Sequence, residues 1–551
     1  MAFLIMVFNL IPLRVEGASN TILPFILRKT NFAFEERVDA LIIDAGKEVI
    51  GSSLSVSDFE THVRSTRIVD PNFVAYDGPR EIIDVYVSQV NDIGYPSDTG
   101  RYIIIDFHDV GWGDGGTTTE GGYTLDSQYT ITYKGSGIKC VDGSIIIPQA
   151  FEQVGAVSPV LDKYRYDNYD GLDYSYFLNE DVQEPLPLVV FFHGGGQGND
   201  IYTPIRFSNG GTVWANPENQ AKYPCHVLAP RNAITPADME KVKGIIDQMI
   251  ADGKVDPNRI YITGFSMGGA STWTFLRTFP EVPAAAAPLC PAGGPRNADE
   301  AKAVAYLPLW TFVDAEDFLL NFVVGTYETY SQYWYDSMLT VLPESRLYEP
   351  PYNGWKFAGH SVWLPVYNEY THPERGKLID WFFSKSKIRG IADVSVQTVS
   401  GVAPVLPETV TVYVNYNATG IKAEERSVVW EAIDPNMYGN DGPGVFTVRG
   451  TIEGCVEKAM ATVIVEYRNR IDDLKEMVKS LALNGGNKNA LTVKLDNAEK
   501  FISQSKPQQA VNMLNAFINQ VNGFRNAGKL AEGQAVEMIE AARETIRNIT
   551  S

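Results

Sequence analysis

The segment Gly-Phe-Ser-Met-Gly at residues 264–268 is the part of this sequence whose residue types and spacing point most directly to chemistry. Ser266 lies between an apolar run at 260–263, which predicts a strand, and residues 269–277, which predict a helix. A sharp strand-to-helix turn lifts a serine hydroxyl off a sheet, and flanking glycines remove the steric conflict of so tight a bend. We therefore predict that Ser266 is a catalytic nucleophile.

A nucleophilic serine needs backbone N–H groups that hold the negative oxygen formed during its attack. The Met267 N–H begins the predicted helix, where the helix dipole favours negative charge. The segment His-Gly-Gly-Gly at 193–196 follows another strand-like run and offers a second donor. We predict an oxyanion hole formed by Met267 and Gly195, with Gly196 as the alternative to Gly195. We expect His193 to orient this loop rather than to act as a base.

The same chemistry requires a base and an acid, in the chain order serine, acid, histidine. Of the six histidines, only His360 and His372 follow the candidate acids. His360 lies in a loop of small residues, where an imidazole can reach the serine. His372 precedes Pro373 and is expected at the surface, before the last helix of this region. We predict that His360 is the base.

The candidate acids come directly after a strand-like run at 309–313 and are Asp314, Glu316 and Asp317. The acid must accept the imidazole N–H and stabilise the imidazolium, so it has to lie on the loop beyond the end of that strand. Asp317 has this offset and is the predicted acid. Asp314 remains the alternative, since it could instead hold the turn.

The pattern of apolar and turn residues along the chain predicts the elements that position these residues. Strand-like and helical segments alternate from about 157 to 387, which predicts a mostly parallel sheet with helices on both faces. Short apolar runs separated by turn residues, at about 22–148 and 391–465, are typical of β-sandwiches. Apolar positions at helical spacing from about 466 to 549 predict a small helical bundle.

The predicted domain order begins with a signal peptide. Residues 2–13 are apolar over the length of a signal segment, and Gly17 and Ala18 suit cleavage, although Arg14 follows the apolar run instead of preceding it. A buried first strand is the alternative; we expect export. The predicted boundaries are 1–20 for the signal peptide, 21–150 for a β-sandwich, 151–388 for the α/β domain, 389–466 for a second β-sandwich and 467–551 for the helical bundle.

Composition narrows the classes of partner. The 551 residues carry a net charge of −21, which repels a phosphate backbone, so we expect no nucleic acid partner. The four cysteines are far apart in sequence and match no metal-ligand spacing, and no glycine loop suits a nucleotide. We expect no metal and no cofactor. Buried free thiols are the expectation, although Cys225 and Cys290 could pair.

Trp214, Trp273 and Trp363 are expected to pack, although each could also hold an aromatic or sugar group.

The region of about 157–387 resembles secreted bacterial esterases of the α/β-hydrolase fold, allied to feruloyl esterases and polyhydroxybutyrate depolymerase-like hydrolases. The segments that carry the resemblance are 187–196, 216–224, 256–269 and 359–363. The resemblance implies Ser266 as nucleophile, His360 as base and Asp317 as acid. It also implies oxyanion donors after His193 and at Met267.

Three flanking segments resemble known modules. The first 150 residues resemble the immunoglobulin-like domain that precedes the hydrolase in some of these esterases. Residues 402–450 resemble a bacterial Ig-like domain, and the tail resembles a FIMAH-type helical module. These resemblances imply an extracellular location and a tethering or spacing role for the modules.

The predicted activity is hydrolysis of a carboxylic ester through an acyl-enzyme. The predicted substrate is an acyl or feruloyl ester of plant polysaccharide, or a short-chain ester. A serine peptidase of the prolyl oligopeptidase kind is one alternative, but the N-terminal segment is too short for the propeller such enzymes carry. A catalytically inactive surface-binding protein is the other alternative, and the complete set of serine, acid and histidine argues against it.

Overall fold

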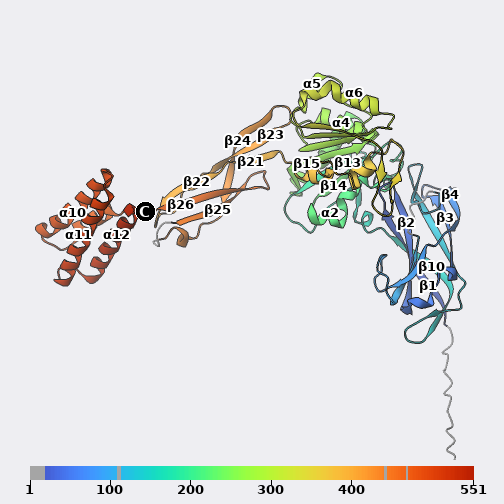
Figure 1. The fold of residues 1–551 in the computed structure, drawn as a ribbon, viewed down its shortest axis with the longest axis horizontal. Helices are drawn as coiled ribbons and strands as arrows, with labels where there is room; N and C mark the ends of the chain where they lie inside the picture. Colours follow the sequence, from blue (N-terminus) through green and yellow to red (C-terminus); the bar gives the residue numbers. More distant parts are fainter. Residues whose placement is uncertain (1–18, 108–112, 440–443, 467–468, 551) are drawn as a thin grey trace, which may run out of the picture. The chain divides into compact units, whose positions relative to one another are not determined.

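A computed structural model describes residues 19–107, 113–439, 444–466 and 469–550 (Figure 1). The expected signal peptide falls almost entirely on residues 1–18 and therefore lies outside the described residues. The chain divides into two compact units. The first is Met1–Lys387 with Asn415–Lys422, and the second is Ile388–Val414 with Ala423–Ser551. None of the described helices combines the length and the apolar character that a membrane crossing requires.

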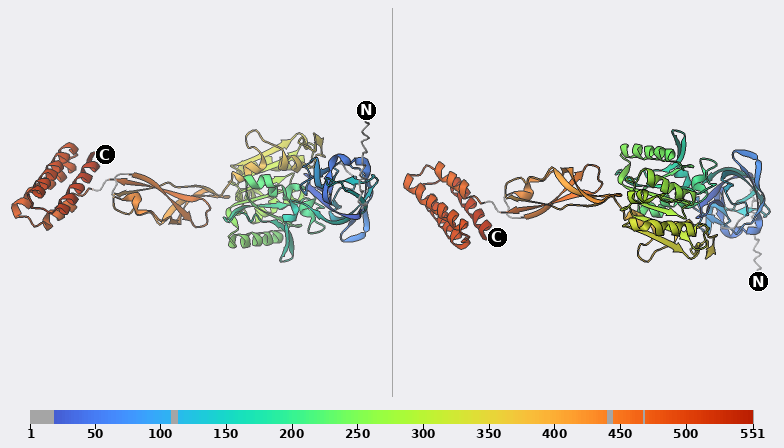
Figure 2. Two further views of the ribbon diagram at one scale, coloured as in Figure 1. Left: turned by 90° about the horizontal axis from the view of Figure 1, so that it is seen from below. Right: turned by 90° about the horizontal axis from the view of Figure 1, so that it is seen from above.

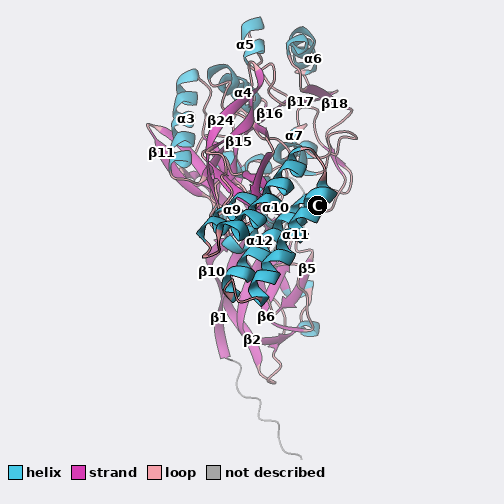
Figure 3. Cartoon of the chain, turned by 90° about the vertical axis from the view of Figure 1, so that its left-hand side faces the viewer, coloured by secondary structure: helices cyan, strands magenta, loops and turns pink. Residues whose placement is uncertain are grey.

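The first unit begins with a β-sandwich of two sheets, ordered β5-β6-β2-β1-β10-β9 and β4-β3-β8-β7. Alternating buried and exposed side chains, as along β3, explain the pairing, because one face of each strand is covered by the opposite sheet. Several of these strands lie side by side in Figure 3. The strands are β1 (Ser19–Asn31), β2 (Glu36–Ile50), β3 (Phe59–Arg67), β4 (Asp70–Arg80), β5 (Asp84–Ser88), β6 (Thr99–Asp106), β7 (Thr119–Glu120), β8 (Tyr123–Tyr133), β9 (Ile138–Lys139) and β10 (Ile145–Val157).

The end of this sandwich differs from the boundary expected at residue 150. Strand β10 continues to Val157, and its last residues still pair with β1, with Ala156 opposite Leu27. Residues 151–157 (Phe-Glu-Gln-Val-Gly-Ala-Val) show no regular alternation of apolar and polar types, so the sequence gives no clear strand signal there. Their pairing with β1, which is distant in sequence, extends the strand.

An eight-stranded sheet follows, in the order β11-β12-β14-β13-β15-β16-β17-β18. The pairs β11–β12 and β12–β14 are antiparallel, and the remaining pairs are parallel. The strands are β11 (Arg165–Tyr169), β12 (Leu172–Phe177), β13 (Leu186–Phe192), β14 (His226–Pro230), β15 (Val255–Phe265), β16 (Ala285–Leu289), β17 (Leu309–Asp314) and β18 (Ser337–Leu342). A short hairpin of β19 (Arg346–Leu347) and β20 (Trp355–Lys356) lies beyond them.

Helices cover both faces of this sheet, as the strand and helix alternation predicts. The central strands are buried throughout, and alternate residues of β13 belong to two separate hydrophobic clusters, one on each face. Figure 1 shows α4 on one side of the sheet and α2 on the other. The helices are α1 (Thr203–Arg206), α2 (Pro217–Lys222), α3 (Pro236–Ala251), α4 (Met267–Thr278), α5 (Ala298–Ala303), α6 (Leu320–Tyr330), α7 (Trp363–Asn368) and α8 (Leu378–Phe383).

The second unit contains a β-domain and a helical bundle, drawn in orange and red in Figure 2. The six strands form one continuous order, β21-β23-β24-β25-β26-β22, rather than two separate sheets. They are β21 (Ile388–Ile391), β22 (Val394–Val399), β23 (Thr409–Tyr416), β24 (Gly420–Trp430), β25 (Gly444–Ile452) and β26 (Lys458–Glu466). The helices α9 (Ile471–Ser480), α10 (Gly485–Ser503), α11 (Pro507–Asn526) and α12 (Glu532–Thr550) share one apolar core at the spacing expected from the sequence.

Candidate active site

Ser266 occupies the single residue between the end of β15 and the start of α4. Its backbone has φ 56° and ψ −117°, a strained conformation that a non-glycine residue adopts only where the surrounding structure imposes it. The flanking glycines make this turn possible. A Cβ on Gly264 would lie 2.5 Å from the carbonyl oxygen of Phe192, and a Cβ on Gly268 would overlap the same oxygen. The strand-turn-helix geometry predicted from the pentapeptide is present.

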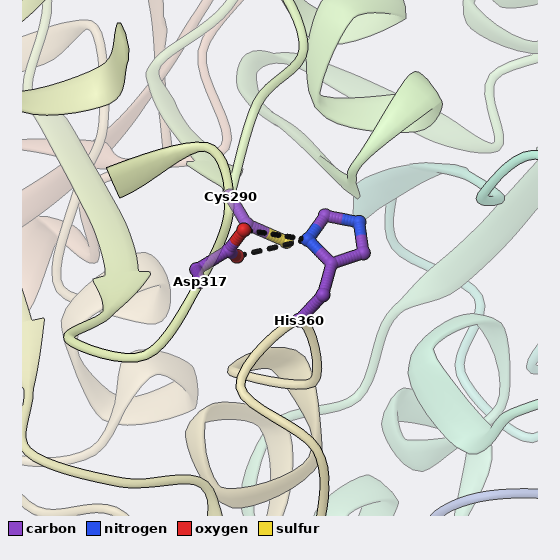
Figure 4. Close-up of side chains that lie close together, drawn as sticks. All are labelled: Cys290, Asp317 and His360. Atoms are coloured by element: carbon purple, nitrogen blue, oxygen red, sulfur yellow. Dashed lines mark hydrogen bonds and ion pairs between the residues drawn. The ribbon is translucent and has the colours of Figure 1, made fainter. Parts of the chain in front are cut away.

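A continuous chain of hydrogen bonds joins Ser266, His360 and Asp317. The Nε2 of His360 accepts from the Ser266 hydroxyl at 2.9 Å, and the Nδ1 donates to both carboxylate oxygens of Asp317, each at 2.9 Å. The Asp317 side chain is fully buried, whereas that of His360 is 23% exposed. The carboxylate therefore lies inside the protein, while part of the imidazole remains accessible. Figure 4 shows Asp317 facing the Nδ1 side of His360.

Asp314, the alternative acid, makes different contacts. It is the last residue of β17, and its carboxylate accepts from the Glu316 N–H at 2.7 Å and from the Ser345 hydroxyl at 2.6 Å. One oxygen therefore holds the turn between the strand and Asp317, and the other binds the segment that follows β18. Of the two candidate acids, Asp317 is the one that contacts His360.

The two predicted oxyanion donors lie beside each other. A Cβ on Gly195 would be 3.9 Å from the Cβ of Met267, so the two backbones adjoin next to Ser266. Within the described part of the chain, neither the Gly195 nor the Met267 N–H has a hydrogen-bond acceptor. Met267 is also the first residue of α4, where the helix dipole places partial positive charge. Both groups are free to donate to a negative oxygen.

His193 is buried, and its two ring nitrogens contact backbone atoms. Its Nδ1 donates to the carbonyl of Gly194 at 2.8 Å, and its Nε2 accepts from the Asn232 N–H at 2.9 Å. Burial lowers the pKa of His193 to about 4, so the ring is neutral near pH 7. These contacts fix the start of the glycine loop and leave neither ring nitrogen free to act as a base.

The other side of the glycine loop contacts the N-terminal sandwich. Asn199 donates through its backbone N–H to the Gly122 carbonyl at 3.2 Å and through its side chain to the Gly121 carbonyl at 2.8 Å. The carboxylate of Asp200 accepts from both the N–H and the hydroxyl of Thr124. The loop that carries Gly195 is thus held by the turn between β7 and β8, a contact that no sequence motif indicates.

Cys290 lies beside the Asp317–His360 pair, which the sequence did not predict (Figure 4). Its sulfur, an Asp317 oxygen and a His360 ring nitrogen lie within 4.8 Å of one another. Burial raises the pKa of the Cys290 thiol well above its ordinary value, and the His360 Nδ1 already carries the hydrogen bonded to Asp317. A metal ion would need a thiolate and a free nitrogen here, so the three residues do not fit a metal site.

None of the four cysteines forms a disulfide within the described residues, and Cys140, Cys225 and Cys290 are buried. Cys225 and Cys290 therefore do not pair, and the expectation of buried thiols holds for these three.

Aromatic side chains surround the imidazole. The ring of Phe318 lies 4.5 Å from that of His360 although Phe318 is 77% exposed, which leaves an apolar surface beside the accessible imidazole. Trp363 stacks on Phe265 at 4.1 Å and meets His360 edge-on at 5.8 Å. Phe318 was not predicted, because nothing but its position after the acid distinguishes it.

Two of the tryptophans named from the sequence lie in the hydrophobic core. Trp214 and Trp273 are buried in the clusters on opposite faces of the sheet. They serve packing, as expected.

Comparison with protein families matches three segments of the chain. Residues 30–146 match the esterase Ig-like N-terminal domain, residues 391–455 match the bacterial Ig-like domain (group 4), and residues 470–547 match the FIMAH domain. The resemblances expected for the three flanking modules are confirmed.

Similar proteins include poly(3-hydroxyalkanoate) depolymerase C of Paucimonas lemoignei, which is 32% identical over 127 residues. The match covers 20% of this chain and 28% of that relative, so the chain spans little more than a quarter of the relative's length. A solved thermostable esterase superposes with a TM-score of 0.56 and 24% identity, over 66% of this chain and 100% of that one. This likeness shows that the covered part of the chain shares the fold of that protein. A ferulic acid esterase aligns at 13% identity over 32% of this chain and 88% of its own, with a TM-score of 0.26.

Proposed function

We propose that the protein is a serine carboxylic-ester hydrolase that works through an acyl-enzyme. The observation that carries the proposal is the hydrogen-bond chain from the Ser266 hydroxyl through His360 to the buried Asp317. Two neighbouring backbone donors without acceptors, at Gly195 and Met267, add the second component that acyl transfer requires. A structural or binding role would need neither the strained serine turn nor the free donors.

The first half of the reaction acylates the serine. The Nε2 of His360 takes the hydroxyl proton of Ser266 as Oγ forms a bond to the ester carbonyl carbon. The carbonyl oxygen becomes negative and accepts from the N–H groups of Met267 and Gly195. Asp317 holds the imidazole in the required tautomer and stabilises its positive charge. When the C–O bond to the alcohol breaks, His360 returns its proton to the departing alkoxide, and Ser266 keeps the acyl group.

The second half repeats these steps with water. His360 removes a proton from a water molecule, whose oxygen attacks the acyl carbon, and the same two N–H groups hold the second oxyanion. Collapse of this intermediate breaks the bond to Oγ, and the proton on His360 returns to Ser266. The products are one carboxylic acid and one alcohol, and the enzyme is regenerated.

We further propose that the substrates are acyl or feruloyl esters of plant polysaccharide, or short-chain esters, and that the enzyme acts outside the cell. The ferulic acid esterase and depolymerase names of similar proteins support an ester substrate. The exposed Phe318 ring beside His360 suits an apolar or aromatic group on the substrate. The two C-terminal modules would tether or space the catalytic unit on a surface.

Hydrolysis by the full chain and by Ser266→Ala tests the proposal. The panel contains p-nitrophenyl esters of increasing acyl length, methyl ferulate, acetylated xylan and a matched peptide amide. Ser331→Ala, at a partly exposed serine after α6, is the matched control. We expect Ser266→Ala to lose ester hydrolysis by a factor of about 10⁴ or more while the control retains it. Ester hydrolysis that survives in Ser266→Ala would refute the assignment, and faster amide than ester cleavage would indicate a peptidase.

A further inference from the structure

Phe318 is an exposed aromatic residue whose backbone is bound to the proposed acid. Its side chain is 77% exposed, more than that of any other phenylalanine that the structure describes. The Asp317 carboxylate accepts from the Leu319 N–H at 2.8 Å, and the Asp317 carbonyl accepts from the Leu320 N–H at 3.0 Å. The segment that carries Phe318 is therefore fixed relative to the pair of Asp317 and His360.

Two aromatic rings contact the imidazole of His360, and they differ in exposure. The ring of Phe318 lies with its centroid 4.5 Å from that of the imidazole, and the two planes are inclined by 43°. Trp363 meets the imidazole edge-on, but its own face stacks on Phe265, and it packs against the hydrophobic core. Of these two neighbours, Phe318 is the one whose ring is open to a substrate.

The reaction decides which half of an ester comes close to the imidazole. In the proposed acylation, Nε2 of His360 gives its proton to the departing alcohol oxygen, which must come within about 3 Å of that nitrogen. The acyl carbon is instead bonded to Ser266, and its oxygen is held by the N–H groups of Gly195 and Met267. The first carbons of the alcohol therefore lie next to the imidazole, where a larger alcohol reaches the Phe318 ring.

We propose that Phe318 binds the alcohol half of the substrate, and that the enzyme favours esters whose alcohol carries an apolar ring face. This inference rests on the proposed ester hydrolysis and assigns one side of its substrate. An aromatic ring binds another ring, or the apolar face of a sugar ring, through dispersion contacts and burial of apolar surface. Phe318 should therefore discriminate between alcohols and not between acyl groups.

Hydrolysis of three esters by the full chain tests this assignment. Benzyl acetate and methyl acetate share the acyl group, and their alcohols have similar acidity, so they differ in the size and apolar surface of the alcohol. Methyl phenylacetate places the aromatic ring on the acyl side instead. The ratio of kcat/KM for benzyl acetate to that for methyl acetate reports the alcohol preference, because both esters form the same acetyl-enzyme. The ratio for methyl phenylacetate to methyl acetate reports the acyl preference. A loss of activity common to all esters cancels in both ratios.

Three variants separate the contact from a structural effect. Phe318→Ala should lower the benzyl-to-methyl ratio about 10-fold, because an aromatic contact contributes about that much, and should keep the acyl ratio within about twofold. Phe318→Tyr keeps the ring and should keep both ratios. Tyr335→Ala is the matched control, because Tyr335 is 74% exposed and precedes β18 at the edge of the sheet opposite to Asp317. Both ratios should equal those of the native protein in this control.

The proposal is overturned if the native protein has a kcat/KM for benzyl acetate no higher than that for methyl acetate, or if Phe318→Ala leaves the benzyl-to-methyl ratio unchanged. A fall confined to the acyl ratio, or an equal loss in Phe318→Tyr, would also overturn it. Circular dichroism of each variant confirms that it is folded. Absence of hydrolysis of these and the p-nitrophenyl esters by the native protein would instead contradict the proposed ester hydrolysis, so the two failures are distinguishable.

Discussion

Gly122 lies in the N-terminal sandwich, yet its replacement should slow ester hydrolysis at Ser266, which lies in the α/β domain. Gly122 has φ +78°, and a Cβ there would lie only 2.1 Å from the carbonyl oxygen of Gly196. Ordinary contact begins at 3.4 Å, so the two segments must separate by about 1.3 Å in Gly122→Ala. Gly196 directly follows Gly195, whose N–H is the proposed oxyanion donor.

The expected magnitude follows from that displacement. Loss of one oxyanion donor lowers kcat by ~10²–10³, and a misplacement of about 1 Å can cost ~10². We therefore expect Gly122→Ala to lower kcat about 100-fold. KM should change little, because the donor acts mainly on the charge that develops in the transition state.

The assay is steady-state hydrolysis of p-nitrophenyl acetate, with thermal unfolding measured in parallel. Gly143→Ala is the matched control, because Gly143 lies in the same sandwich with φ +82° but has no atom within 4 Å of the added Cβ. The control carries the same backbone strain without the clash and should retain kcat. The reasoning fails if Gly122→Ala keeps kcat within about twofold of the native value, or if Gly143→Ala loses as much activity.

Three further predictions concern single side chains. Asp317→Asn should lower kcat by ~10⁴ because the imidazole loses the acceptor that orients it. Asp314→Asn should mainly lower the free energy of unfolding, by about 1–3 kcal/mol. Kinetics and thermal unfolding of both variants check this, and equal losses of kcat would contradict it. Burial lowers the pKa of His226 to about 4, so between that value and the ordinary 6.5 the unfolded chain binds a proton that the folded chain does not. The free energy of unfolding should therefore decrease as the pH is lowered through this window, by roughly 2–3 kcal/mol from His226. Urea unfolding at about pH 7 and 4.5 should show a smaller decrease in His226→Gln. Cys290 should resist iodoacetamide at about pH 8 because its buried thiol stays protonated. Mass spectrometry should find Cys290 modified only after denaturation, and rapid loss of activity on alkylation of Cys290 would contradict this.

The sequence predicts the arrangement of the candidate site well because its local signals are strong. Ser266 lies in a pentapeptide whose flanking glycines are needed for a strand-to-helix turn, and the structure has that turn. Chain order alone reduces the histidines to His360 and His372, and His360 is the one that reaches the serine. Asp314 and Asp317 could not be separated in this way, because both follow the same strand. The buried acceptor contacts of Asp314 decide between them.

Contacts between distant segments are what the sequence does not reveal. Gly122 and Gly196 lie in different domains, and neither glycine differs locally from an ordinary turn residue. The extension of β10 to Val157 depends on pairing with β1 more than 100 residues earlier in the chain, so a local pattern places the boundary too early. Cys290 follows β16 at the same edge of the sheet as Ser266 and Asp317, but the strand order that brings them together is a property of the folded sheet.

The central claim is that the Ser266 hydroxyl, activated by His360, becomes acylated. Treatment of the full chain with a fluorophosphonate, followed by peptide mass spectrometry, tests it most directly. We predict one equivalent of label, located on Ser266, with labelling slowed by excess ester substrate and absent in His360→Ala over the same time. Continued ester hydrolysis by protein that carries no label on Ser266, or full labelling of Ser266 without loss of hydrolysis, would contradict the account.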